Sequence, residues 1–455
     1  MEQYNQILSS IKDLVWSPPL LILLIGTGIY LTIILRGVQF RYLGYALKQA
    51  ILPSKADSKG DISQFDALMT SLAGAIGTGT IVGVTTAIMV GGMGAMFWMW
   101  VTAFFSMATK YAESLLAVKY RTTDRRGEMC GGPMQYIEKG LGWKWMAILF
   151  ALLGAIAAIG TGNLVQVNAI GDTINHVWFV DPWVTGLCLA VVTGFVIIGG
   201  VKSIGYVAGI LVPIMALFYL VAGLIIIGLH IDKIPEAFTL IVESAFQGQA
   251  AIGGFVGSTV MMSIQMGVSR SIFSNEAGLG ISSMAAAAAR TDCPGRQAMI
   301  TMTGALISTV IVCSITGLVL AVTEVQGALS ATGKPLAGAT MAIQAFSSTL
   351  PGGEYIVSIG LILFAFSTVI AWAYYGEKCF EYVLGEGSVI FYRILFTLII
   401  IPGAALKLEV AWHLADIMNG LMAIPNLIAL LGLSKVIVSE THSFLAIIKK
   451  EQESI

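Results

Sequence analysis

The chain has 455 residues, of which 56% are hydrophobic and only 11% are charged. Soluble domains carry about 25% charged residues, so this composition excludes an ordinary soluble enzyme and indicates a membrane protein. The net charge of −1 at pH 7 gives no reason to expect nucleic acid as a partner, and we expect none.

Apolar stretches long enough to cross a bilayer, about 20 residues each, recur along the whole chain. We predict eleven spans, at residues 17–36, 64–91, 94–118, 144–174, 182–201, 204–229, 251–289 (broken), 297–323, 354–375, 388–405 and 408–437. This pattern predicts an all-α polytopic membrane protein surrounded by the lipid bilayer. We divide the chain into an extra N-terminal helix with a cytoplasmic linker (1–63), two five-helix repeats (64–229 and 230–437) and a cytoplasmic tail (438–455).

The distribution of Lys and Arg predicts the orientation, because positive residues in short loops stay on the cytoplasmic side. With eleven spans, 18 such residues fall on one side, and four fall on the other: Lys12, Lys233, Lys334 and Lys407. We therefore expect the N-terminus outside the cell and the C-terminus in the cytoplasm. Segments 235–250 and 336–350 then lie outside as amphipathic or re-entrant pieces.

The span at 64–91 contains three glycines within six residues, Gly74, Gly77 and Gly79. Each weakens a helix by about 1 kcal/mol relative to alanine, which predicts a break in the middle of the span. Unwound backbone at this depth is tolerated where it lines a cavity, and its freed groups then become ligands. The alternative is that small residues only let helices pack closely, as we expect at Gly83 and Gly91.

Two sets of backbone groups flank this break. The N–H groups of Thr78 and Gly79 begin the second half-helix, where the helix dipole would favour a carboxylate. The carbonyls of Ala73 and Ile76 precede the break and would suit a small hard cation, which prefers oxygen ligands. The first break therefore predicts a site for both an anionic and a cationic group.

The span at 251–289 is interrupted by a polar, glycine-containing run at 269–280. If the first span is set aside, the other ten divide into five and five, and a break opens each half. Such a pattern is typical of transporters built from inverted repeats with a midplane site. Arg270 and Glu276 near the second break form either a gate or a structural pair, whereas Lys110 and Glu113 are expected to pair or snorkel at the interface.

Three motifs carry a resemblance to a known family: Ala73–Gly79, Gly162–Asn168 and Ser274–Gly280. Through them the chain resembles the alanine or glycine:cation symporters over essentially its whole length, and that family is similar in architecture to the leucine-transporter (LeuT) fold. The resemblance implies alternating access in the cell membrane, with sodium-coupled symport of a small neutral amino acid, alanine or glycine. It implies no obligatory protein partner.

The resemblance also implies the site residues. It places the substrate carboxylate on Thr78 and Gly79, with Gly77 as a further substrate-binding residue. It places sodium between the carbonyls of Ala73 and Ile76 and two adjacent hydroxyls, those of Ser367 and Thr368. Without the family, such hydroxyls in an apolar helix can simply bond to their own backbone one turn back.

Further candidates come from polar and aromatic residues inside the spans. The amides of Asn163, Gln166 and Asn168 are costly in lipid and should face the protein interior, either as site groups or as bonds between helices. We favour Gln166 and Asn168 for the site, although these two do not share a helix face with each other.

Trp372 lies one turn beyond Thr368 on the same helix face. With Phe273 and Ser274 beside the second break, it predicts a pocket for alanine or glycine and not for leucine. Ordinary packing is the alternative for both aromatics.

Sodium is favoured as the coupling ion because the span at 204–229 has no Lys, Asp, Glu or His to carry a proton. The main rival is a proton-coupled or exchange-type carrier of the same architecture. A channel would need a repeated filter or a charged ring, and an enzyme would need clustered catalytic groups; the sequence shows neither.

Overall fold

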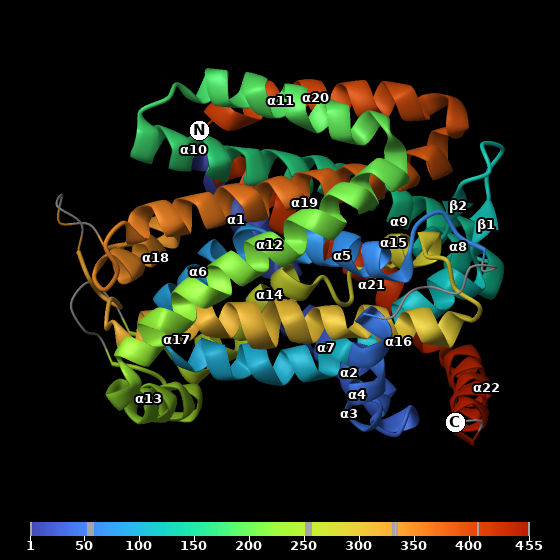
Figure 1. Ribbon diagram of the computed structural model, residues 1–455, viewed down its shortest axis with the longest axis horizontal. Coiled ribbons are helices and arrows are strands. Elements are labelled where there is room, and N and C mark those ends of the chain that lie inside the picture. The colour runs from blue at the N-terminus through green and yellow to red at the C-terminus, as the bar shows by residue number, and fades with distance from the viewer. Residues whose placement is uncertain are drawn as a thin grey trace.

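The computed structural model describes residues 2–51, 59–250, 257–329, 333, 335–406 and 409–453. Residues 251–256, which begin the seventh predicted span, and the orientation markers Lys55, Lys334 and Lys407 lie outside the described residues. The described chain is almost entirely helical, as expected for a polytopic membrane protein (Figure 1).

The described residues of the first half of the chain form twelve α-helices and a short hairpin. The helices are α1 (Glu2–Val15), α2 (Pro18–Ile34), α3 (Val38–Arg41), α4 (Leu43–Ile51), α5 (Gln64–Ala75), α6 (Val82–Gly91), α7 (Gly94–Lys119), α8 (Pro133–Tyr136), α9 (Lys144–Ala157), α10 (Val165–Trp178), α11 (Pro182–Ile198) and α12 (Gly200–Leu229). The hairpin joins antiparallel strands β1 (Thr122–Thr123) and β2 (Met129–Cys130). A 3₁₀ turn, η1 (Thr78–Thr80), stands between α5 and α6, and π-helical turns stand at η2 (Ile137–Leu141) and η3 (Ala158–Leu164).

In the second half, the part of the chain that the structure describes forms ten α-helices. They are α13 (Ile234–Gln247), α14 (Val260–Asn275), α15 (Ser283–Ala288), α16 (Pro294–Ala305), α17 (Ser314–Val322), α18 (Gly338–Ser347), α19 (Gly353–Leu384), α20 (Val389–Ala405), α21 (Glu409–Gly432) and α22 (Ser434–Glu453). A π-helical segment, η5 (Leu306–Cys313), joins α16 to α17, and 3₁₀ turns η4 (Ile231–Lys233) and η6 (Glu386–Ser388) precede α13 and α20.

Within the described residues, seven helices are long and apolar enough to cross a membrane. They are Gln6–Ile34, Lys144–Trp178, Gly200–Leu229, Pro294–Val322, Gly353–Leu384, Glu386–Ala405 and Trp412–Gly432. Two shorter apolar helices, Val82–Gly91 and Pro182–Ile198, add to these. The helices are compatible with the eleven predicted spans and establish a multi-pass membrane protein, while the repeat boundaries stay a prediction.

Local signals set several helix ends. The hydroxyl of Ser63 accepts the N–H of Asp66 at 3.0 Å and starts α5, and Asp181 accepts the N–H of Trp183 at 2.8 Å at the start of α11. Several helix ends differ from those of the predicted spans. α19 continues to Leu384, well past residue 375, and the predicted tail is largely a separate helix, α22, which packs on α16 and α7.

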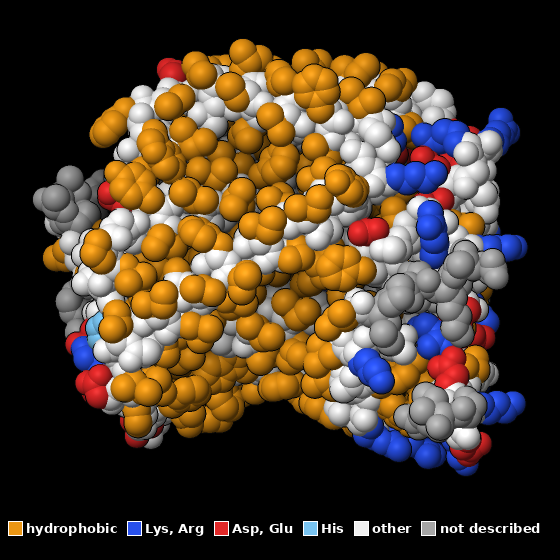
Figure 2. Space-filling model, in the orientation of Figure 1, with side chains coloured by type: hydrophobic (Ala, Val, Ile, Leu, Met, Phe, Trp, Pro, Cys, Tyr) orange, Lys and Arg blue, Asp and Glu red, His pale blue; other side chains and the backbone are white. Residues whose placement is uncertain are grey.

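The long helix α19 lies at the centre of the packing, in contact with α5, α9, α10, α12 and α18, and α7 packs against α14 and α16 (Figure 1). The face shown in Figure 2 is broadly hydrophobic, and Lys and Arg side chains gather at one end of it, where the hairpin, α8 and α22 lie in Figure 1. Such a belt with a charged end matches a protein immersed in lipid.

Candidate functional site

The first predicted break is present. α5 ends at Ala75, Ile76 leaves the helical conformation, and the chain resumes as the turn η1 before α6. Gly77 is required here by close approach, because a Cβ at this position would overlap the hydroxyl of Thr368 and lie 3.2 Å from Oε1 of Gln166. The break is therefore held open by side chains from α19 and α10.

The second predicted break is also present. α14 ends at Asn275, and Glu276 takes a left-handed conformation with φ of 59°. Gly278 and Gly280 have φ of 87° and 77°, which glycine adopts without strain, and α15 begins only at Ser283. The unwound segment from Glu276 to Ser282 lies inside the protein, and its backbone groups need partners there.

Glu113 supplies those partners. Its Oε1 accepts the N–H groups of Gly278 at 2.9 Å and Gly280 at 3.1 Å, and the amide of Asn426 at 2.7 Å. Asn426 also donates to the carbonyl of Gly278 at 2.8 Å and accepts the hydroxyl of Tyr136. The unwound backbone is thus tied to α7, α8 and α21.

This arrangement corrects the expectation for Lys110 and Glu113. Both side chains are about 1% exposed, and neither reaches a membrane interface. Lys110 donates to the hydroxyl of Ser71 at 3.3 Å, and the two residues form no ion pair with each other in the described structure. The two residues are three apart on α7, but each side chain forms a hydrogen bond to a residue of another segment instead.

The four residues proposed for sodium meet in one place. Thr368 Oγ1 lies 2.9 Å from the carbonyl oxygen of Ala73, and Ser367 Oγ lies 3.3 Å and 3.5 Å from the carbonyl oxygens of Ala73 and Ile76. Both hydroxyls also donate to the carbonyl of Phe364 one turn back, at 2.8 Å and 3.0 Å. The local bond and the approach to the break therefore coexist, and four neutral oxygens converge.

The side-chain amides of Asn163, Gln166 and Asn168 have different partners. Gln166 lies at the break, where its Oε1 accepts the N–H of Thr78 at 3.2 Å. Asn168 donates instead to the carbonyl of Leu406 at 2.8 Å, and Asn163 donates to that of Phe396 at 2.7 Å. The structure brings Gln166 to the predicted site but uses Asn168 as a bond between helices.

The two candidate side chains beside the second break, Phe273 and Ser274, also lie in different surroundings. Phe273 packs against Gly79, where a Cβ would lie 2.7 Å from its ring, and it stacks on Trp412 with centroids 6.1 Å apart. Ser274 points to Cys313 on η5 at 3.1 Å and does not face η1 in any described contact. Phe273 is therefore one of the side chains that join the two breaks.

Trp372 is 2% exposed and packs on Gly162, where a Cβ would overlap its side chain. Its ring meets that of Tyr375 edge-on, and its indole approaches the carboxylate of Glu276. Trp372 thus lies close to the second break, next to the π-helical turn η3.

Arg270 pairs with Asp416 on α21 at 3.2 Å and lies over the ring of Phe273. The pair borders a cavity of about 450 Å³ whose lining includes Trp16, Met262 and Thr86. α14 runs from Val260 towards the break, and the cavity is lined by residues of α14 that precede Phe273, such as Met262.

The model of the sodium:alanine symporter family matches residues 1–455. The chain belongs to this family. It is 51% identical to the sodium/alanine symporter AgcS of Methanococcus maripaludis, over 99% of both chains, and 33% identical to the amino-acid carrier protein AlsT of Bacillus subtilis, over 95% of this chain and 90% of that protein.

Solved structures show the fold. MhsT in complex with L-phenylalanine superposes with a TM-score of 0.58 at 12% identity, over 84% of this chain and 99% of that one. A manganese transporter of Eremococcus coleocola gives 0.54 at 11% identity, over 85% and 82%. The expectation of a LeuT-type fold is confirmed, and the chain is a transporter and not an enzyme.

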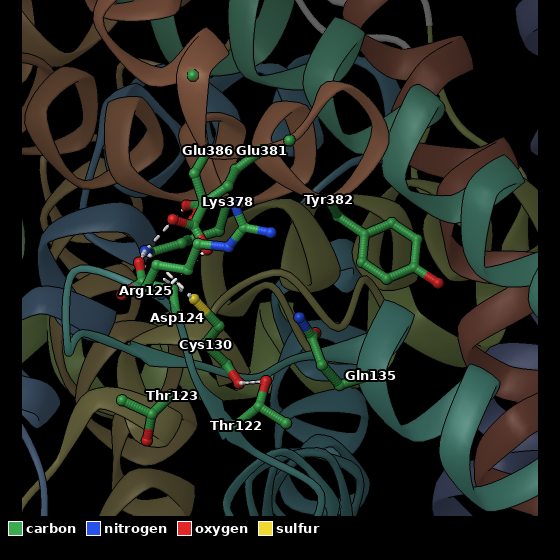
Figure 3. A pocket seen from close by; sticks show the side chains of 12 residues that line it. Thr122, Thr123, Asp124, Arg125, Cys130, Gln135, Lys378, Glu381, Tyr382 and Glu386 are labelled. Carbon is green, nitrogen blue, oxygen red and sulfur yellow. Dashed lines mark hydrogen bonds and ion pairs between the residues drawn. The ribbon is translucent and has the colours of Figure 1, made fainter.

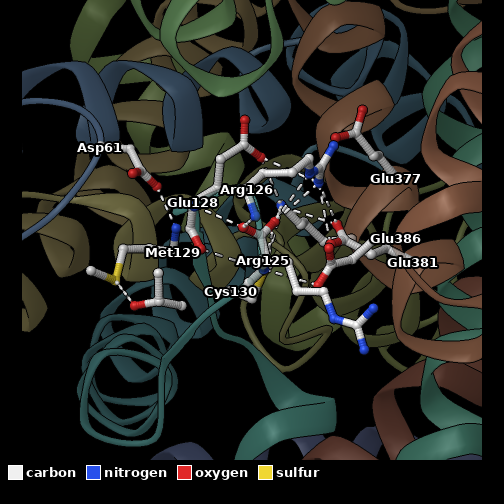
Figure 4. A network of polar contacts seen from close by, with 12 residues as sticks. Asp61, Arg125, Arg126, Glu128, Met129, Cys130, Glu377, Glu381 and Glu386 are labelled. Carbon is white, nitrogen blue, oxygen red and sulfur yellow. Dashed lines mark hydrogen bonds and ion pairs between the residues drawn. The ribbon is translucent and has the colours of Figure 1, made fainter.

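At the opposite end from the Arg270 cavity, this family member has a second cavity of about 440 Å³ under the β1–β2 hairpin (Figure 3). Lys378, 2% exposed on its side chain, pairs with Glu381 at 3.0 Å, Glu128 at 3.2 Å and Asp124 at 3.8 Å. Arg126 adds pairs to Asp124 and Glu381 at 3.1 Å and 3.2 Å (Figure 4).

The hairpin is also bound to the segment before α5. The N–H of Met129 donates to Asp61 at 2.7 Å, and burial of this carboxyl group raises the pKa of Asp61 above its ordinary value. Asp124 holds the turn itself by accepting the N–H groups of Arg126 and Glu128 at 2.9 Å and 2.8 Å. These bonds close this end of the molecule around α19.

Sequence reasoning missed Glu113, Asn426 and Tyr136 as the residues that hold the unwound segment. A signal existed, because a carboxylate in an apolar span is costly unless it has partners, and the unwound segment 276–282 offered unpaired N–H groups. The pairing itself joins residues about 165 positions apart, which one sequence does not reveal.

Proposed function

We propose that this chain carries a small neutral amino acid, alanine or glycine, into the cell together with sodium, by alternating access across the cell membrane. The amino-acid carboxylate would bind the N–H groups of Gly77, Thr78 and Gly79, with Gln166 beside them. Sodium would bind four oxygens, those of Ala73, Ile76, Ser367 and Thr368.

The observation that carries the proposal is the meeting of these four oxygens at the first break. Each is neutral, and each belongs to a group that the unwound backbone or α19 brings within 3.5 Å of another. Hard monovalent cations prefer such oxygen ligands, whereas a proton needs a titratable group. The name of the relative AgcS, a sodium/alanine symporter, supports the same pairing of ion and substrate.

The size of the substrate follows from the aromatic side chains around the breaks. Phe273 fills the space beside Gly79 and is backed by Trp412, and Trp372 fills the space beside Gly162. A leucine side chain would need at least one of these rings to move, whereas the methyl group of alanine would not. We therefore propose exclusion of leucine-sized substrates.

We further propose that the N-terminus lies outside the cell and the C-terminus in the cytoplasm. Lys and Arg gather at the end with the hairpin and α22 (Figure 2), which by the positive-inside tendency is the cytoplasmic end. The cavity beside Arg270 and Asp416 then opens outwards, and substrate would enter through it.

A proton-coupled carrier of the same fold is the second candidate. α12, which corresponds to the predicted span at 204–229, has no titratable group except tyrosines and Lys202 near its start, as expected for sodium coupling. However, Lys110, Glu113 and Glu276 are buried near the second break. Those three groups keep proton coupling as an alternative that experiment must separate.

Uptake into proteoliposomes tests the proposal. Radiolabelled alanine should accumulate when sodium is imposed outside at equal pH, and should not accumulate with a pH gradient alone in potassium or choline. Accumulation driven by the pH gradient without sodium would replace sodium by the proton, and exchange without net accumulation would replace symport by exchange.

A further inference from the structure

Glu276 is the residue at which α14 ends and the unwound segment begins, and its side chain is 1% exposed. Among the described residues, no donor meets hydrogen-bond geometry with either carboxylate oxygen, and Glu276 takes part in no ion pair. The ammonium of Lys110 and the indole of Trp372 lie near enough to interact, but neither satisfies the oxygens.

The contrast with Glu113 defines what is unusual. Both carboxylates are buried beside the same unwound segment, but Oε1 of Glu113 accepts three N–H groups within 3.1 Å. Lys110, whose charge interacts with both carboxyl groups, donates a hydrogen bond to the hydroxyl of Ser71. A buried carboxylate is stable only when it is paired or hydrogen-bonded. Glu276 therefore needs a partner, and the protein itself does not provide one.

The carboxylate faces the other broken helix. A Cβ at Gly74 would lie 3.0 Å and 3.2 Å from its two oxygens, and 3.1 Å from the ring of Tyr375. The carbonyl oxygen of Gly74 is itself 3.4 Å from Thr368 Oγ1, in the oxygen cluster described above. Glu276 therefore places its carboxyl group against the last turn of α5, beside the site and with Trp372 next to it.

We propose that Glu276 binds a monovalent cationic group at the junction of the two broken helices: the α-ammonium of the amino acid or a sodium ion additional to the one at Ser367 and Thr368. This inference rests on the proposed function. The missing partner is then the transported amino acid or sodium ion, so the carboxylate is paired only when one of these is bound. The absence of a side chain at Gly74 lets the carboxylate lie this close, because an added Cβ would be within 3.2 Å of both of its oxygens.

The test is equilibrium binding of radiolabelled alanine to the purified full-length protein at a series of sodium concentrations. Glu276→Gln keeps the shape and removes the charge. Glu377→Gln is the matched control, because Glu377 is a buried carboxylate on α19 that is paired with Arg393 at 2.6 Å and not with the breaks. The control should bind alanine and sodium within about twofold of the unmodified protein.

If the ammonium is the partner, Glu276→Gln raises the Kd for alanine at least about tenfold, and saturating sodium does not restore it. If sodium is the partner, the sodium concentration at half-maximal binding rises at least about tenfold, and alanine affinity recovers at saturating sodium. Both results support the proposal and identify the cation.

Changes below about twofold in both quantities, or an equal loss in Glu377→Gln, overturn the proposal. Should Glu276→Gln fail to give a monodisperse protein, Glu276→Asp is measured in the same way, because it keeps the charge but withdraws it from Gly74. Failure of the unmodified protein to bind alanine in sodium would instead contradict the proposed function, so the two failures are distinguishable.

Discussion

Two polar regions lie inside this apolar protein: the end around the hairpin, and the junction of the two broken helices. They differ in whether their charged side chains have partners. Around Lys378, three carboxylates lie within 3.8 Å of one ammonium. At the junction, the neutral oxygens of Ser367 and Thr368 approach those of the first break. The carboxylate oxygens of Glu276 there have no hydrogen-bond partner among the described residues. A buried polar group without a hydrogen-bond partner needs an explanation, and a bound ligand is one that fits the junction.

The largest expected effect comes from breaking the paired region. Lys378→Met removes the cation from three carboxylates, and breaking a buried ion pair costs about 3–5 kcal/mol. We expect a clearly lower midpoint of thermal unfolding in detergent. Lys449→Met, on a 78% exposed side chain, is the control and should leave the midpoint unchanged. An unchanged midpoint for Lys378→Met would show that the network does not hold this end closed.

The next effect separates the paired carboxylate at the junction from the unpaired one. Glu113→Ala leaves the N–H groups of Gly278 and Gly280 without an acceptor, at about 1–3 kcal/mol for each unpaired group. Glu113→Gln keeps an acceptor oxygen, and we expect it to recover most of the thermal stability. Equal losses in both variants would mean that the charge of Glu113, and not its hydrogen bonds, matters.

Gly77→Ala tests the geometry of the first break. The added methyl group would collide with the hydroxyl of Thr368, and overpacking of this kind costs about 1–3 kcal/mol. We expect alanine affinity to fall by about 5- to 150-fold. Gly228→Ala, where a Cβ meets nothing within 4 Å, is the control with unchanged affinity. Comparable affinity in the two variants would contradict the site at Gly77.

The smallest effect concerns a single oxygen of the proposed ion site. Thr368→Val keeps the shape and removes the hydroxyl, and loss of one neutral polar interaction costs about 0.5–1.5 kcal/mol. We expect the sodium concentration at half-maximal alanine binding to rise by about 2- to 12-fold. Thr173→Val is the control, since its hydroxyl only donates to Ala169 one turn back, at 2.7 Å. A shift in the control alone would remove Thr368 from the ion site.

The sequence predicted the helices and both breaks because their signals are local. Long apolar runs identify the spans, and clustered glycines at 74–79 and 278–280 mark unwound backbone that glycine adopts without strain. The family resemblance supplied Ser367 and Thr368 as partners for Ala73 and Ile76, and the structure places all four together.

Other features depend on contacts between distant residues. Asn168 and Gln166 look alike in the sequence, yet one bonds to Leu406 and the other to Thr78. Lys110 and Glu113 have the spacing of a helix pair, but each finds a different tertiary partner. Which polar group in an apolar span meets the site is decided by the packing of α7, α10 and α21, and no local pattern encodes it.

The central claim is that sodium and a small amino acid bind together at the junction of the broken helices. Equilibrium binding of radiolabelled alanine to the purified protein, in sodium and with sodium replaced by potassium or choline at several pH values, tests it most directly. The account predicts binding that needs sodium and that glycine, but not leucine, competes away. Binding that is independent of sodium and follows pH would contradict it.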